Sequence, residues 1–256
     1  MKSPETRHGR SGGRTPEALR PIKIVPDFIE TADGSALIEM GRTRVVATAT
    51  IEEKLPPFLK GAGQGWVTAE YAMLPRATEK RTPRERQQGY PSGRSQEIQR
   101  LIGRSLRAVT DLKALGERQI ILDCDVLQAD GGTRVASINA ACIALALALK
   151  RLLDEKYIGI LPLRHLVGAV SVGLVGGEAL CDLDYAEDSG AETDMNVVET
   201  DRGQLLEVQA TAEQAPFSRN QLDTLLKLAD AGIAEIIQVQ KEVLKKKSLL
   251  FMAYGR

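Results

Sequence analysis

The chain has 256 residues, of which 43% are hydrophobic and 27% charged, so it has enough apolar residues to bury a core. Lys and Arg together number 34, as do Asp and Glu, so the formal net charge at pH 7 is zero. This composition excludes a wholly disordered chain and a collagen-like chain. The longest purely apolar run, residues 140–149, is shorter than the roughly 18 residues that a membrane span requires, so we expect a soluble protein.

The N-terminal sequence and the cysteine content both favour a cytoplasmic protein. The first ten residues are basic but are followed by no apolar stretch, so no secretory signal is visible. Three Cys at wide spacings and two His favour neither a disulfide framework nor a zinc site. We therefore expect a cytoplasmic protein with reduced thiols.

Charge is unevenly distributed along the chain. Basic residues outnumber acidic ones in residues 76–107, whereas residues 181–201 contain many Asp and Glu and neither Lys nor Arg. A basic zone favours a phosphate or polyanion, and an acidic one favours a hard cation, so the two together are typical of a phosphoryl-transfer site. The alternative is that both are ordinary solvated surface.

The first half of the chain predicts a meander followed by helices. Residues 1–21 are polar and rich in Gly and Arg, which predicts an N-terminal arm. Alternating apolar runs broken by turn residues predict an antiparallel meander at 22–28, 35–40 and 43–51, with a further strand at 66–73. Apolar residues at helical spacing then predict an amphipathic helix that begins near Arg94 and ends near Val109.

The second part of the pattern repeats this order of strands and helices. A buried strand, a Gly-Gly turn and a largely apolar helix are predicted at 119–127, 128–134 and 135–152. Two hairpins follow, with strands at 166–175, 178–184, 194–200 and 204–211. Ser218 and Gln221 form a capping-box pattern that opens a last helix. We predict an α+β fold: one domain at 22–256, made of pseudo-repeated halves at about 22–156 and 157–256.

The glycine turn, residues 130–134, is a candidate anion site. It joins a predicted strand to a predicted helix, where free backbone N–H groups and the helix dipole favour an anion. Thr133 adds a hydroxyl donor and Arg134 a bidentate guanidinium group, and Arg94 stands at the start of the other helix. A turn that merely ends a strand, and an exposed Arg94, are the alternatives, since neither a Walker A loop nor GxGxxG is present.

The acidic loop, residues 182–194, is a candidate cation site. Its carboxylates are too crowded to ionise together at neutral pH unless a cation offsets them. Carboxylate ligands without His or Cys suit Mg²⁺ or Mn²⁺, and the EF-hand spacing is absent. Asp123 and Asp125 point to one face of their strand, and the sequence leaves open whether they are structural or support the site.

Several blocks in one order resemble the ribonuclease PH family of phosphate-dependent 3′→5′ exoribonucleases and nucleotidyltransferases, over nearly the whole chain. The blocks are residues 13–14 with 19–21, 56–59, 65–71, 73–78, 92–104, 123–134 and 185–196. The resemblance implies a ribosomal-protein-S5-domain-2-like fold, duplicated within the chain. It further implies a homohexameric ring, a trimer of dimers, that binds RNA 3′ ends and neither DNA nor a membrane.

The resemblance also implies the roles of particular residues. Inorganic phosphate, the co-substrate, is expected at Arg94, Gly132, Thr133 and Arg134, and Mg²⁺ or Mn²⁺ at the catalytic carboxylates Asp188 and Asp194. RNA contacts are expected at Arg76, Arg81, Arg84 and Arg100. The implied activity trims tRNA precursors, and rRNA 3′ ends remain open as a second substrate. It releases nucleoside diphosphates and runs in reverse as nucleotide addition.

The chain departs from the family pattern at a few positions, and rival functions follow from the residues. Val135 stands where Thr is usual, Gly190 where Ala or Ser is usual, and Gly12 where Asp is usual. We expect the missing hydroxyl at Val135 to affect the rate of the reaction more than its type. The main rival is a non-catalytic RNA-binding ring subunit of an exosome-like assembly, and a second is a metal-dependent hydrolase that acts with water.

Overall fold

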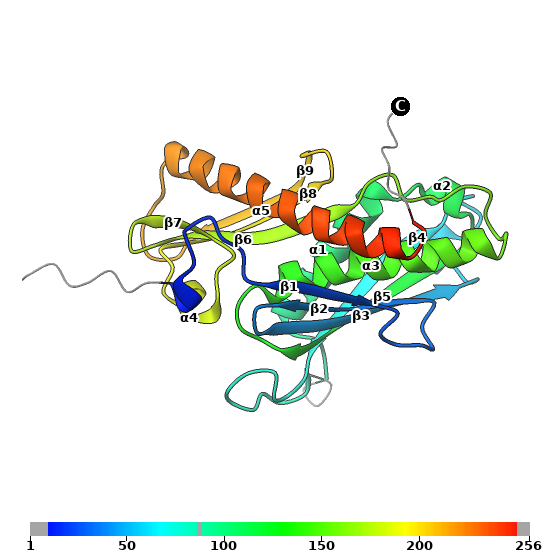
Figure 1. Cartoon of the computed structure of the whole chain (residues 1–256). Coiled ribbons are helices and arrows are strands. Elements are labelled where there is room, and N and C mark those ends of the chain that lie inside the picture. The colour runs from blue at the N-terminus through cyan, green and yellow to red at the C-terminus, as the bar shows by residue number, and fades with distance from the viewer. Residues whose placement is uncertain (1–9, 86–88, 250–256) are drawn as a thin grey trace, which may run out of the picture.

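The computed structural model describes residues 10–85 and 89–249, which form two β-sheets with helices packed against them (Figure 1). Two short 3₁₀ turns, η1 (Ser11–Gly13) and η2 (Pro57–Leu59), lie in the arm and between the third and fourth strands. The arrangement of sheets and helices confirms the predicted α+β fold class.

The first sheet contains the predicted meander. Its strands have the order β1-β2-β3-β5-β4, and every pair is antiparallel except β4 with β5. Side chains alternate between buried and exposed along β3 and β5, as expected for a sheet with one face on the core. The strands span β1 (Ile22–Pro26), β2 (Gly34–Met40), β3 (Thr43–Glu52), β4 (Trp66–Met73) and β5 (Gln119–Gln128).

Helix α1 (Gly93–Val109) and helix α3 (Thr133–Asp154) cover the first sheet, α1 over β4 and α3 over β2, β3 and β5. The Ser92 side chain accepts a hydrogen bond from the backbone N–H of Ser95 and so caps α1. Ile98, Leu101 and Ile102 form part of its buried face, as the spacing predicts. A single turn, α2 (Leu112–Leu115), follows α1 and is capped by Asp111.

Helix α3 is buried on nearly all sides. By length and composition it could cross a membrane, but 89% of its most apolar stretch lies inside the protein. It packs against the first sheet and also against β6 of the second sheet, so both sheets share it. Asn139 on α3 donates to the carbonyl of Ala169 on β6 and accepts from its N–H, each at 2.9 Å, which satisfies backbone that β7 does not reach.

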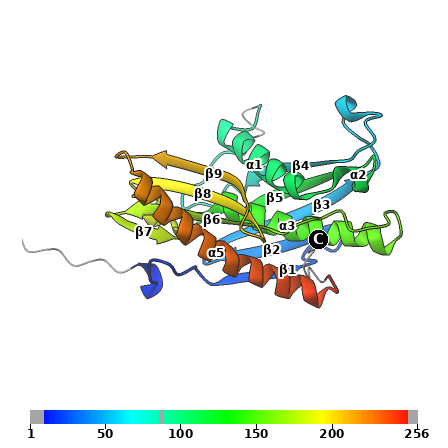
Figure 2. The same ribbon diagram turned by 90° about the horizontal axis from the view of Figure 1, so that it is seen from above.

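The second sheet has four antiparallel strands in the order β7-β6-β8-β9. These are β6 (Val167–Val175), β7 (Glu178–Cys181), β8 (Thr193–Thr200) and β9 (Leu205–Ala212). Helix α5 (Arg219–Lys246) opens with the predicted capping box of Ser218 and Gln221. It covers the second sheet and then reaches β1 of the first sheet (Figure 2).

Two features near the acidic loop differ from the prediction. Strand β7 ends at Cys181 instead of residue 184, because Asp182 adopts a left-handed conformation with φ 53° and its carboxylate binds Arg20. Residues predicted as loop form a short helix, α4 (Tyr185–Ser189), between β7 and β8. The described part of the arm lies beside α4 (Figure 1), and Cys181 N–H donates to its Pro16 carbonyl.

Candidate active site

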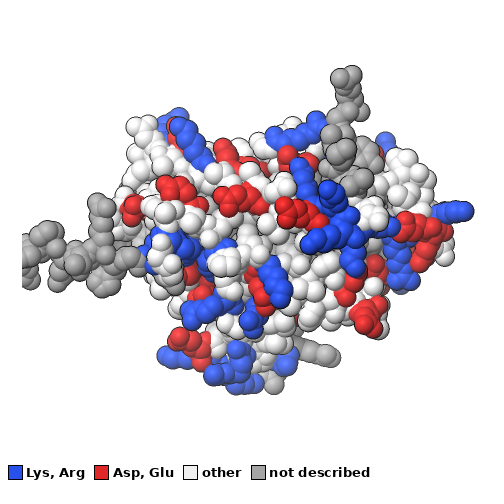
Figure 3. Space-filling model, in the orientation of Figure 1, with Lys and Arg blue, Asp and Glu red and all other residues white. Residues whose placement is uncertain are grey.

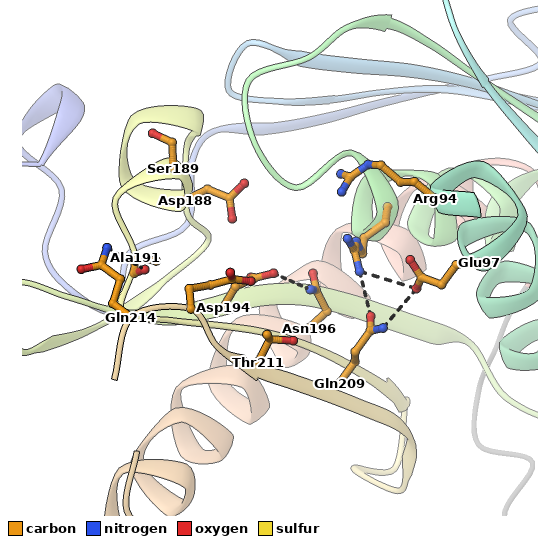
Figure 4. Close-up of a pocket in the computed structure, with 12 residues that line it drawn as sticks. Arg94, Glu97, Asp188, Ser189, Ala191, Asp194, Asn196, Gln209, Thr211 and Gln214 are labelled. Atoms are coloured by element: carbon orange, nitrogen blue, oxygen red, sulfur yellow. Dashed lines mark hydrogen bonds and ion pairs between the residues drawn. The ribbon is translucent and has the colours of Figure 1, made fainter. Parts of the chain in front are cut away.

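A polar pocket of about 570 Å³ lies where the N-terminal ends of α1 and α3 face α4, β8 and β9. In Figure 4 its charged groups divide into two sides, with Arg94 across the pocket from the carboxylates of Asp188 and Asp194. The amides of Asn196 and Gln209 line its floor along β8 and β9. The two candidate sites of the sequence therefore border one pocket.

The two pocket arginines differ in how they are held. Arg94 is exposed and forms no hydrogen bond or ion pair with any described residue. The Arg134 side chain is only 14% exposed and donates to Gln209 Oε1 at 2.7 Å, with Glu97 Oε1 3.6 Å away. Two guanidinium groups at helix N-terminal ends can bind one tetrahedral oxyanion from two directions.

The N-terminus of α1 has fewer groups available to bind an anion than the sequence predicts. Ser92 caps one N–H, and the Glu85 carboxylate accepts a hydrogen bond from Ser95 Oγ at 2.6 Å. A carboxylate of the chain itself therefore occupies the region where the dipole favours negative charge. From this end of α1, the side chains of Arg94 and Glu97 line the pocket, and only Arg94 of the two carries positive charge.

The glycine turn gives α3 an N-terminus without a side-chain cap. Gly131 and Gly132 have φ of 75° and 66°, a left-handed conformation that glycine adopts without strain. Thr133 is buried, and its Oγ1 lies 2.9 Å from Tyr71 Oη. Arg134 lines the pocket, whereas Gly132 and Thr133, which precede it in the chain, are not among the lining residues. Val135 is fully buried in the core and does not line the pocket.

Asp188 on α4 and Asp194 on β8 form the negative side of the pocket. Burial raises the pKa of both carboxyls above the ordinary value, and the charge of Asp188 raises the pKa of Asp194 further. Arg94 and Arg134 partly oppose the shift at Asp188. Asn196 donates to Asp194 Oδ2 at 3.3 Å, but neither carboxylate forms an ion pair with a residue in the described ranges.

These two carboxylates are suited to a divalent cation that keeps other ligands. Among the described residues no group of three or more His, Cys, Asp and Glu forms a complete metal cage. Mg²⁺ commonly binds one or two carboxylates and takes its remaining ligands from water and substrate phosphates. An unpaired carboxylate pair beside two arginines fits that pattern.

Most other carboxylates of the acidic loop are neutralised by the arm, which corrects the expectation that a metal offsets the whole cluster. Arg20 binds Asp182 with Nη2 at 2.7 Å from Oδ1. Arg10 Nε lies 2.8 Å from Glu187 Oε1. Only Asp188 and Asp194 of the loop face the pocket as carboxylates.

The residues expected to contact RNA lie outside this pocket. Arg76, Arg81 and Arg84 are exposed in the loop between β4 and α1, and Arg100 is exposed on α1. Figure 3 shows Lys and Arg side chains on the part of the molecule where this loop projects. Two further arginines of α1 are committed within the chain, since Arg104 binds Glu207 and Arg107 lies over Trp66.

The structure adds site residues that the sequence analysis missed. Gln209 and Glu97 hold Arg134, Asn196 holds Asp194, and Tyr71 holds Thr133. Tyr71, Glu97 and Asn196 lie in resemblance blocks, which were the available signal, whereas Gln209 lies outside them. Asp123 and Asp125 do not line the pocket, although burial raises the pKa of both.

Solved structures with a similar fold include exosome structures. Rice (Oryza sativa) Rrp46 has a TM-score of 0.73 at 21% identity, with 91% of this chain and 98% of that chain covered. The Archaeoglobus fulgidus exosome with RNA bound to its active site has a TM-score of 0.76 at 24% identity, covering 90% and 92%. An archaeal exosome core has a TM-score of 0.70 at 22% identity, covering 91% and 90%.

Family models match both parts of the chain in order. Residues 18–150 match domain 1 of the 3′ exoribonuclease family, and residues 165–232 match domain 2. The first match includes Arg94 and the glycine turn, and the second includes Asp188 and Asp194. On these matches, the chain belongs to the 3′ exoribonuclease family.

Proposed function

We propose that the protein is a phosphate-dependent 3′→5′ exoribonuclease of the ribonuclease PH type. It trims the 3′ ends of tRNA precursors, releases nucleoside diphosphates, and adds nucleotides in the reverse direction. The pocket between the two sheets is its active site. Cytoplasmic RNA with a free 3′ end is its substrate class.

One observation carries the proposal: two arginines at helix N-terminal ends share a pocket with two carboxylates that have no ion-pair partner in the described ranges. Arginine forks bind phosphate oxygens, and paired carboxylates suit a hard divalent cation. A pocket with both can hold an attacking phosphate beside a phosphodiester. That combination is what phosphorolysis requires.

The chain's own residues bind and orient the reacting groups. Arg94 and Arg134 hold inorganic phosphate, with the unsatisfied N–H groups at the start of α3 nearby. One phosphate oxygen attacks the phosphorus of the last internucleotide linkage, and the bond from that phosphorus to the 3′ oxygen breaks. Because phosphate is already an anion at neutral pH, the step needs no general base. The proton of hydrogen phosphate passes to the leaving 3′ oxygen, and the nucleotide is released as a diphosphate.

Asp188 and Asp194 would hold Mg²⁺ or Mn²⁺. When bound there, the cation neutralises charge on the transferring phosphoryl group and on the leaving 3′ oxygen. The raised pKa of both carboxyls agrees with a site that gains stability when positive charge enters it.

RNA approaches along basic surface, and the protein works as a ring. Arg76, Arg81, Arg84 and Arg100 are exposed and would contact the RNA backbone. The Archaeoglobus fulgidus exosome, which shares the fold, has RNA bound to its active site, and this supports an RNA 3′ end in the pocket. We propose a homohexamer, a trimer of dimers, which light scattering tests directly.

The decisive experiment incubates the purified full chain with 3′-labelled RNA and Mg²⁺, with and without inorganic phosphate. The released nucleotide is identified by chromatography against monophosphate and diphosphate standards. Release of diphosphates only when phosphate is present supports the proposal. Asp194→Asn serves as the inactive control.

The two rival functions give different results in the same experiment. Monophosphates released without added phosphate would identify a metal-dependent hydrolase. RNA binding with no release, in a preparation whose ring has formed, would identify the non-catalytic RNA-binding subunit. Two of the similar structures come from exosomes, and this observation favours the second candidate.

A further inference from the structure

We propose that the N-terminal arm is part of the active site, and that Arg10 is a positioning residue for Asp188. The inference rests on the proposed function of the pocket. Arg10 acts through Glu187, the residue that precedes Asp188 on α4. Arg14 and Arg20 bind further carboxylates of the acidic loop, and we call the three arginines together the clamp.

All three guanidinium nitrogens of Arg10 donate hydrogen bonds to the acidic loop or to the arm. Its Nε and Nη2 lie 2.8 Å and 3.0 Å from the two carboxylate oxygens of Glu187, a bidentate pair. Nη2 also donates to the carbonyl of Cys181 at 2.7 Å, and Nη1 to the carbonyls of Thr15 and Pro16. The side chain is only 7% exposed, so this geometry is well defined.

Glu187 determines how α4 begins. Its Oε2 accepts the backbone N–H of Asp184 at 3.0 Å, while the Asp184 side chain accepts the N–H of Glu187, which completes a capping box. Helix α4 has only five residues and no buried ones, so neither helix propensity nor a core face stabilises it. Its orientation, and that of Asp188, therefore depends on the capping carboxylate that Arg10 and Arg14 hold.

The clamp also joins the carboxylate side of the pocket to the glycine turn. Arg20, 5% exposed, binds Asp182 through its backbone N–H, Nε and Nη2. Its Nη1 donates to the carbonyl of Asp130 in the glycine turn. One arm thus connects the loop that carries Asp188 to the turn that precedes Arg134, and fixes the spacing between the two sides of the pocket.

Support of Asp188 through Glu187 is expected to affect metal affinity. Groups that orient a metal ligand commonly change metal affinity by about 10-fold to 100-fold when they are removed. Here the supporting group is a buried ion pair on the residue next to the ligand. Its loss leaves Glu187 without a bidentate partner beside Asp188, so α4 can turn and the carboxylate pair loses its geometry.

The test compares Arg10→Ala and Glu187→Gln with the wild-type full chain. Mn²⁺ is the probe, and its binding is measured by electron paramagnetic resonance without substrate. The site is identified as the one lost in Asp194→Asn. We expect Mn²⁺ to bind about 10-fold more weakly in each variant, with no further loss in the double variant. Arg10→Lys should recover part of the affinity.

Arg118→Ala is the matched control. Arg118 also makes a 2.8 Å ion pair with a glutamate and donates to a backbone carbonyl, but it lies immediately before β5, at the end of that strand away from the glycine turn. If Arg10→Ala lowers the melting temperature as Arg118→Ala does and leaves Mn²⁺ affinity unchanged, Arg10 is merely structural and the inference is wrong. Phosphorolysis is assayed separately, so an inactive wild type that binds Mn²⁺ refutes the proposed function alone.

Discussion

At the level of single residues, Asp188 and Asp194 differ from their acidic neighbours because they face the pocket and lack an arginine partner in the described ranges. We expect Asp194→Asn to lower phosphate-dependent turnover by about 10³-fold or more, since it removes half of the cation's protein ligands. RNA affinity, measured by filter binding, should stay close to that of wild type. Full activity in this variant would contradict the metal assignment.

Arg94 gives a prediction about phosphate. Because its guanidinium group forms no hydrogen bond or ion pair with a described residue, a charge-assisted contact to phosphate is its expected use. Arg94→Ala should raise the KM for phosphate about 10-fold to 100-fold, the cost of losing one such contact. Arg104→Ala is the control, because Arg104 lies on the same helix outside the pocket and binds Glu207. An equal KM in both variants would place the phosphate elsewhere.

Glu199 on β8 makes stability depend on pH. Burial, together with the facing carboxylate of Asp230 on α5, raises the pKa of Glu199 to about 7 from an ordinary 4.5, and its Oε1 has no hydrogen-bond partner in the described structure. Between these two pH values the folded protein keeps a proton that the unfolded chain releases. The free energy of unfolding therefore falls as pH rises through this window, and it stays lower above pH 7.

The Glu199→Gln variant tests whether the free energy of unfolding falls as pH rises. The amide stays neutral, so the variant should be more stable than wild type at pH 8, by about 1–3 kcal/mol, and similar near pH 5. Thermal unfolding from pH 5 to pH 8 measures the difference. Parallel stability curves for the two proteins would show that Glu199 does not titrate in this range.

At the level of elements, the glycine turn and the acidic loop contact each other at Gly131. A Cβ at this position would lie 2.6 Å from the Leu183 carbonyl oxygen and the Asp184 carbonyl carbon. Gly131→Ala should therefore push the turn away from the loop and lower both the melting temperature and kcat. Gly61→Ala separates strain from crowding, because Gly61 has a similar φ of 77° and no neighbouring atom within 4 Å. Equal effects would mean that the contact itself does not matter.

Most elements could be predicted because their signals are local. The alternating residues of β3, the apolar spacing of α1 and the Ser218 capping box depend on nearby residues, and the structure has all three elements. Helix α4 could not be predicted in this way. Its five residues are held by Arg10, which lies 177 positions from Glu187 in the chain.

The candidate site could be predicted in its charged residues but not in its supporting contacts. Arg94, Arg134, Asp188 and Asp194 were singled out by charge and by the resemblance, and the structure gathers them around one pocket. The Arg134–Gln209 bond joins residues 75 positions apart and depends on how β9 lies beside α3. The parallel pairing of β4 with β5 is likewise a matter of tertiary arrangement that strand patterns alone do not specify.

At the level of the whole molecule, exposed arginines outside the pocket predict RNA binding through phosphate contacts. Affinity for a single-stranded RNA should fall with salt, and Arg81→Gln with Arg84→Gln should reduce the logarithmic slope by about 1 to 1.5, as expected for two lost contacts. Arg104→Gln is the control, because Arg104 already binds Glu207 at 2.7 Å. A salt-independent isotherm, or an unchanged slope in the double variant, would contradict this binding mode.

The position of helix α3 determines whether the two halves of the chain can fold separately. Its sides are covered by the first sheet and by β6, so neither sheet retains a complete core when the other is removed. A fragment that ends after α3 would expose one apolar side of that helix, and the remaining fragment would expose the inner face of the second sheet. The two fragments are therefore expected to aggregate separately and to reconstitute a folded protein when they are expressed together.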